Sequence, residues 1–102
     1  RWKMMKKRLI AEVNEADVVK YVKEYISENQ DEFDTLCKQI KEDMSEDETA
    51  DLGTIEGILT IDGTLDDITY KISEMMDTED TQIENDICNE YAKLVSEAVE
   101  KL

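Results

Sequence analysis

Apolar residues recur at steps of three and four along most of the chain, which is the spacing of one face of an α-helix. The longest such stripe lies at the C-terminal end, with apolar side chains at positions 83, 87, 91, 94, 98 and 102. Shorter stripes occupy residues 2–13, 18–26, 33–44, 52–59 and 65–76. The pattern predicts six helical segments, of which the last is the longest.

Polar residues between the stripes predict where the helices are interrupted and where they begin. Residues 29–31 and 77–80 are polar or acidic breaks. Ser45 and Glu48 have the spacing of a capping box, and so do Thr64 and Asp67, so each pair predicts the start of a helix. The absence of proline and the presence of only three glycines also favour helices.

Two short segments fit a strand as well as a helix. Residues 57–62, flanked by Gly57 and Gly63, could form a strand and a turn, and so could residues 9–13. We therefore predict an all-α fold, a compact bundle of four to six short, mostly antiparallel helices. The alternative is a mostly α fold with one small two-stranded hairpin. No long linker divides the 102 residues, so residues 1–102 are expected to form one acidic helical domain.

The N-terminal segment differs in charge from the rest of the chain. Residues 1–8 carry five basic residues and no acidic one, together with Trp2. We expect this segment to be peripheral and to lie against the protein's own acidic surface. A contact arm for a partner is the alternative. Asn14 is the expected N-cap of the helix that follows.

Acidic residues are concentrated in the middle of the chain. Residues 42–90 contain 17 acidic residues and one basic residue, Lys71, in a protein whose net charge is −15. Such a charge disfavours direct binding to nucleic acid or to an anionic membrane and favours a cationic partner. A highly charged surface that serves only solubility explains the same composition.

Three groups of these acidic residues are the candidate partner-binding surface. The first lies before the fourth predicted helix, the second flanks the following turn, and the third precedes the last helix. The predicted residues are Asp43, Glu46, Asp47, Glu48, Asp51, Asp62, Asp66, Asp67, Asp77, Glu79, Asp80, Glu84 and Asp86. Helix capping explains part of each group, because acidic residues stabilise helix N-termini.

The charge density approaches that of DNA. Forty-nine helical residues have an axis of about 74 Å, or roughly 25 Å when folded into three legs. B-DNA of that length carries roughly 15 charges. In size, charge and helicity the chain resembles the DNA-mimic inhibitors that phages and mobile elements use against defence or regulatory proteins, although no motif carries the resemblance.

We therefore expect a small binding or inhibitor protein that presents a DNA-like anionic surface to a cationic protein, in particular a nucleic-acid-binding enzyme or regulator. One alternative is a structural or assembly adaptor, or a self-associating helical subunit. Another is an antitoxin or immunity-type inhibitor of a basic toxin. A homodimer is left open.

Enzyme chemistry has few candidates in this sequence. Histidine is absent, and the glycines fit no phosphate-binding loop. Loops starting at Asp43 or Asp77 lack the glycine and glutamate that an EF-hand requires. Helical magnesium-dependent nucleotide pyrophosphatases resemble the chain in size and helicity, but Glu28 and Asp31, which have the ExxD spacing, flank a predicted break. We expect no enzyme activity, no metal and no cofactor.

Cys37 and Cys88 adjoin apolar stripes and are expected to be buried free thiols, which is typical of a reducing compartment. A disulfide between them is the alternative. No run of 18 apolar residues occurs, so no membrane-spanning helix is expected. These observations predict a cytoplasmic protein.

Overall fold

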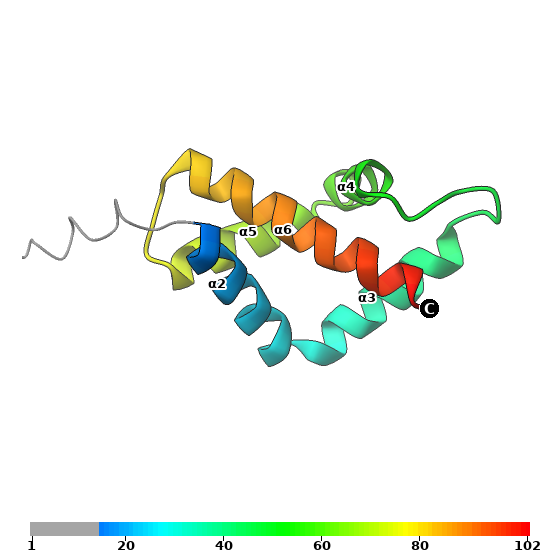
Figure 1. Ribbon diagram of the computed structural model, residues 1–102, viewed down its shortest axis with the longest axis horizontal. Helices are drawn as coiled ribbons and strands as arrows, with labels where there is room; N and C mark the ends of the chain where they lie inside the picture. The colour runs from blue at the N-terminus through cyan, green and yellow to red at the C-terminus, as the bar shows by residue number, and fades with distance from the viewer. Residues whose placement is uncertain (1–14) are drawn as a thin grey trace, which may run out of the picture.

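The structure, a computed structural model, describes residues 15–102 and contains five α-helices in that part of the chain (Figure 1). They are α2 (Glu15–Glu28), α3 (Gln30–Asp43), α4 (Leu52–Ile61), α5 (Thr64–Met75) and α6 (Thr81–Glu100). None of the described residues lies in a β-strand. The predicted all-α bundle is therefore confirmed. The predictions for residues 1–14, including the basic segment, the helix over residues 2–13 and Asn14, fall outside the described residues.

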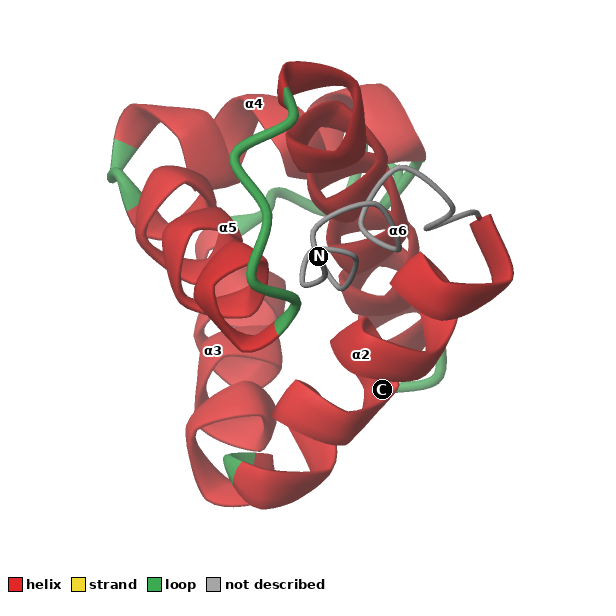
Figure 2. Ribbon diagram, turned by 90° about the vertical axis from the view of Figure 1, so that its left-hand side faces the viewer, coloured by secondary structure: helices red, strands yellow, loops and turns green. Residues whose placement is uncertain are grey.

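The last helix, α6, is the centre of the bundle. It packs against α2, α3, α4 and α5, which surround it on several sides (Figure 2). Its inner face consists of residues that are 8% exposed or less, among them Ile83, Ile87, Tyr91, Val95 and Val99. The prediction that the last helix is the longest is confirmed for the described residues, and the structure adds that this helix is also the central one. Leu102 lies beyond the end of α6 and is 56% exposed, so its predicted place on the buried stripe is wrong.

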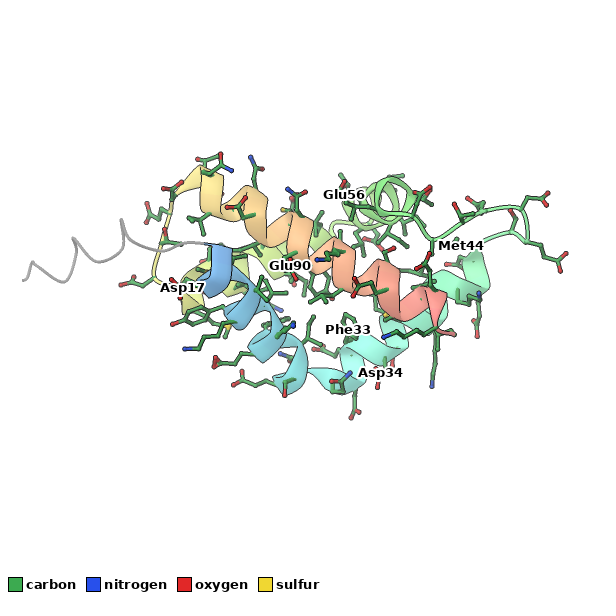
Figure 3. The ribbon with its side chains drawn as sticks, viewed as in Figure 1. Asp17, Phe33, Asp34, Met44, Glu56 and Glu90 are labelled. Atoms are coloured by element: carbon green, nitrogen blue, oxygen red, sulfur yellow. The ribbon has the colours of Figure 1, made fainter. Side chains whose placement is uncertain are left out.

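The helices that surround α6 bury one face each. Phe33 of α3 is buried on the side that faces α6, whereas the neighbouring Asp34 points outward (Figure 3). Val22 of α2 and Ile72 of α5 are fully buried in the same apolar cluster. Each of these helices therefore has a buried apolar face and a polar outer face, as the spacing of three and four predicts.

The segment that could have been a strand belongs to α4. Ile55 and Leu59, four residues apart, are fully buried, which is the geometry of a helix packed against a core. Space around Gly57 is open, so no close backbone contact explains this glycine. The alternative two-stranded hairpin over residues 57–62 is therefore wrong, because burial with a period of four outweighed the local strand propensity.

The predicted start of the fourth helix is wrong. Glu48 does accept a hydrogen bond from the Ser45 backbone N–H, but the two residues form a turn, and α4 begins at Leu52. The buried Ala50 lies between this turn and the start of α4, and its carbonyl accepts a hydrogen bond from the Ser96 hydroxyl of α6. The chain must extend to reach this buried contact, which delays the helix. Leu52, predicted to be buried, is 42% exposed.

Two further boundaries differ from the prediction. The break between α2 and α3 is the single residue Asn29, so Gln30 and Asp31 belong to α3 rather than to a loop. The N-cap of α5 is Gly63, with a φ of 79°, and Thr64 is already helical. Glycine adopts this left-handed conformation without steric cost, which permits a tight turn between α4 and α5.

Candidate functional site

The predicted surface residues are accessible but do not form one continuous face. All thirteen are exposed, apart from the half-buried Glu84 and Asp86. The first group lies at the end of α3 and in the connection that follows it, and the third lies in the connection between α5 and α6 and in the start of α6, at the opposite end of the molecule (Figure 1). The second group, at the turn between α4 and α5, lies between them in the chain. A partner that contacts all three groups would have to span the length of the bundle.

Helix capping accounts for several of these carboxylates. Asp51 caps α4 by accepting a hydrogen bond of 2.8 Å from the Thr54 backbone N–H, and this bond lowers the pKa of Asp51. Asp80 caps α6 through the backbone N–H groups of Gln82 and Ile83. Asp62 accepts from the Thr64 backbone N–H at 3.1 Å. These three residues have a structural role that requires no partner.

Other predicted residues lie in the first turns of helices. Asp66 and Asp67 are in the first turn of α5 and Glu84 in that of α6, where negative charge is favourable. Asp67 also forms an ion pair with Lys71, at 3.1 Å between the carboxylate and the ammonium, the only ion pair found within residues 15–102. Because both side chains are more than half exposed, this ion pair contributes little stability.

Four acidic residues line a groove of about 540 Å³ at the end of α5. Glu74, Asp77, Glu79 and Glu84 line it, together with Tyr70, Ser73 and Thr78, and no basic side chain contributes to its lining. We call this feature the acidic groove. Glu74 is at the C-terminal end of its helix, where negative charge is unfavourable, so capping does not explain its position.

The backbone around the acidic groove is held by a network of hydrogen bonds. The Thr78 backbone N–H donates to the Ser73 carbonyl and the Asp77 N–H donates to the Glu74 carbonyl, each at 3.1 Å. This is a Schellman motif, in which the residue at the Asp77 position is left-handed and usually glycine. Asp77 adopts a φ of 56° there. The sequence thus places an aspartate at a position where glycine is usual.

The next two residues continue the network. The Thr78 hydroxyl accepts a hydrogen bond of 3.1 Å from the Asp80 backbone N–H, and Asp80 in turn caps α6. Thr78 is itself buried. The connection between α5 and α6 is therefore fixed at both of its ends, and the acidic groove is largely preformed.

Tyr70 forms the edge of the acidic groove and is 63% exposed. A hydrogen bond to Glu74 raises the pKa of Tyr70, and the negative charge of Glu74 adds to this effect. Asp66, Tyr70 and Glu74 follow one another at steps of four along the outer face of α5. An exposed aromatic ring thus lies between carboxylates.

Three of the thirteen predicted residues line the acidic groove, namely Asp77, Glu79 and Glu84. The sequence interpretation did not select Tyr70 or Glu74. Their spacing of four was visible in the sequence, but it did not show that this side of the helix faces outward beside an acidic turn.

The remaining candidate groups are the other acidic residues and the two cysteines of the described chain. None of its acidic residues or cysteines form a group of three or more that could hold a metal ion. Both cysteines are free; burial raises the pKa of the Cys37 thiol to about 11, and the Cys88 sulfur lies 3.0 Å from the Thr69 hydroxyl. The environment of Cys37 therefore does not activate a thiolate.

The chain matches no known protein family, and neither a curated protein nor a solved structure is significantly similar to it. Within residues 15–102, none of the helices combines the length and the apolar character that crossing a membrane requires.

Proposed function

We propose that this protein is a binding protein that docks its acidic groove onto a cationic surface of a nucleic-acid-binding enzyme or regulator and thereby inhibits it. The observation that supports this most directly is the meeting of Glu74, Asp77, Glu79 and Glu84 in one preformed groove without a basic residue. Grouping like charges costs free energy unless a partner compensates them.

The charge along α5 is comparable to that of duplex DNA. The helix has 12 residues and an axis of about 18 Å, and B-DNA of that length carries roughly 10 charges on both strands. Eight carboxylates and one lysine lie along α5 and its two ends, which gives a net charge of −7. The carboxylates are Asp62, Asp66, Asp67, Glu74, Asp77, Glu79, Asp80 and Glu84. The roughly 10 phosphate charges are spread around the duplex, and a protein that binds DNA contacts only part of them. The net charge of −7 along α5 is therefore similar to the charge that such a protein contacts on DNA.

Tyr70 suits the role of an anchor. Tyrosine and arginine are enriched among the residues that dominate binding energies at interfaces. The exposed ring of Tyr70, flanked by Asp66 and Glu74, would stack on an arginine or lysine side chain while the carboxylates compensate its charge. The stacking would add specificity to an otherwise electrostatic surface.

Exposed apolar residues give the packing-based alternative less support. The large ones in the described chain are Leu52, Ile61, Tyr70 and Leu102, which are spread over α4, α5 and the end of the chain. They form no stripe of the kind that a helical adaptor or a self-associating subunit would use. An antitoxin or immunity-type inhibitor would use the same acidic surface against a basic toxin. The free cysteines favour a cytoplasmic location.

Two matched variants test the proposal. The groove variant carries Glu74→Gln, Asp77→Asn, Glu79→Gln and Glu84→Gln. The loop variant carries Asp43→Asn, Glu46→Gln, Asp47→Asn and Glu48→Gln, and each variant loses four negative charges. Wild type and both variants are immobilised, proteins are captured from a bacterial lysate, and the bound proteins are eluted with salt and then with duplex DNA and identified by mass spectrometry.

The expected result is a set of nucleic-acid-binding proteins that wild type and the loop variant capture and that the groove variant loses. Duplex DNA should release them by competition, because both ligands would occupy the same cationic site. The proposal would be contradicted by capture that is equal for both variants, or by captured proteins that resist salt and DNA.

A further inference from the structure

A second pocket lies on the other side of α5. It has a volume of about 230 Å³ and is enclosed by α2, α3, α5 and α6. Tyr25, Phe33, Ile68 and Tyr91 contribute to its walls, and the charged residues that line it are Glu32, Asp67 and Lys71. We call it the tyrosine pocket. Its volume is several times the roughly 30 Å³ of a water molecule.

Two buried tyrosines line this pocket. Tyr91 is 3% exposed and Tyr25 is 8% exposed. Within the described part of the chain, neither hydroxyl makes a hydrogen bond, although the Tyr91 ring packs edge-on against Phe33 at 6.0 Å between ring centroids. Buried tyrosine hydroxyls usually have a partner, because an unsatisfied polar group in the interior is costly. These two hydroxyls are therefore available to a ligand.

The charges around the tyrosine pocket favour a cation. Burial raises the pKa of Tyr91, with smaller contributions from Cys37, Tyr25 and Glu32, so the hydroxyl stays neutral. Lys71, the one basic residue of the lining, is ion-paired with Asp67, and its positive charge also acts on Tyr25, where it opposes the rise in pKa that burial causes. No basic residue within residues 15–102 is ion-paired with Glu32. The lining therefore carries one uncompensated negative charge.

We propose that the tyrosine pocket binds a small organic cation, an alkylammonium or alkylguanidinium group. The hydroxyls of Tyr25 and Tyr91 would accept its N–H groups, the aromatic rings would contact its apolar stem, and Glu32 would compensate its charge. The pocket is smaller than the roughly 300–1,000 Å³ typical of drug-sized ligands, which suits a short stem. The proposal is independent of the acidic groove, because the two sites share no residue.

Titration with n-butylguanidinium, followed by methyl NMR, tests this site. We expect saturable shifts of the Ile26 and Ile68 methyl groups, both of which line the pocket. The neutral isostere n-butylurea should leave them unchanged. Tyr91→Phe, which keeps the ring against Phe33, should weaken binding about fivefold, the effect of one hydrogen bond.

Two further variants separate the pocket from the general negative charge of the protein. Glu32→Gln should weaken binding by about threefold, as expected for an exposed ion pair. Glu46→Gln removes the same charge from the α3–α4 connection and should leave the shifts of Ile26 and Ile68 unchanged. The thermal unfolding of each variant establishes that it is folded.

The proposal is overturned if butylurea binds as well as butylguanidinium, if Tyr91→Phe binds as tightly as wild type, or if the Ile26 and Ile68 methyl groups do not shift. The organic cation has two sources, a protein side chain or a free amine or guanidine. Titration with an arginine whose termini are capped distinguishes them. Binding as tight as that of butylguanidinium supports a protein side chain as the occupant, and at least tenfold weaker binding supports a free amine or guanidine.

Discussion

The α3–α4 connection and the acidic groove beside the α5–α6 connection lie at opposite ends of the molecule (Figure 1). Carboxylates of the first end are Asp43, Glu46, Asp47 and Glu48, and those of the groove are Glu74, Asp77, Glu79 and Glu84. Residues 44–51 form an extended loop, tied to α6 by the bond from Ser96 to Ala50. The shorter acidic connection after α5 is fixed by a Schellman motif and by the N-cap of α6. Equal charge thus occurs once on a long loop and once in a preformed groove, and preformed charge binds a partner at lower entropic cost.

The largest expected effect is the loss of partner binding when Tyr70 is replaced. This exposed aromatic residue belongs to the acidic groove, and the α3–α4 connection has no counterpart. Tyr70→Ala should weaken binding to a captured partner roughly tenfold to thirtyfold, as is typical of an aromatic anchor. Tyr70→Phe keeps the ring and should lose much less. Titration calorimetry measures both. Equal losses for the two variants would mean that the hydroxyl, rather than the ring, carries the contact.

The tether of the loop provides the next test. Ser96→Ala leaves the buried Ala50 carbonyl without its donor and should lower the free energy of unfolding by about 1–2 kcal/mol. Hydrogen exchange should speed up in residues 45–51 and stay unchanged in residues 76–80. Urea denaturation gives the stability, and unchanged exchange in the loop would show that this bond does not hold it.

Asp77, the left-handed residue of the acidic groove, is expected to affect both the stability of the protein and its binding to a partner. Asp77→Gly relieves the steric cost of φ 56° and should raise the stability by up to about 1 kcal/mol, while partner binding weakens through the lost carboxylate. Asp77→Asn removes the charge and tolerates the same conformation, so it should weaken binding without the gain in stability. Thermal unfolding and calorimetry on both variants separate strain from charge.

The smallest expected effect is the pH dependence of the loop end. Hydrogen bonding from Thr54 lowers the pKa of Asp51 below its ordinary value of 3.8, so its stabilisation is complete above that value and is lost as the pH falls through the lowered pKa. Asp51→Asn keeps a side-chain acceptor without a titrating group. Between pH 5 and pH 2 the wild type should lose more stability than this variant. Parallel curves from urea denaturation would contradict this assignment.

The sequence predicted the helices well because their apolar spacing reflects the same burial that forms the core. It failed where a distant contact decides a boundary. Ser45 and Glu48 satisfy a capping box locally, yet the bond between Ser96 and Ala50 delays the helix by several residues. Such a contact joins residues 46 positions apart, and no local pattern records it.

The candidate site was predicted only in part for a similar reason. Acidic residues were visible in the sequence, but their grouping into one groove depends on how the chain turns at Asp77. Tyr25 and Tyr91 were correctly expected to be buried. That their hydroxyls lack a partner within the described chain became visible only once four helices had been placed around them.

The central claim is that the preformed acidic groove, rather than net charge, binds the cationic partner. The most direct test measures the affinity of one captured partner for wild type, the groove variant and the loop variant at several salt concentrations. Both variants have a net charge of −11 instead of −15. We predict that the groove variant loses most of the affinity and most of the salt dependence, while the loop variant stays close to wild type. Equal losses in both variants would contradict the claim and leave net charge as the explanation.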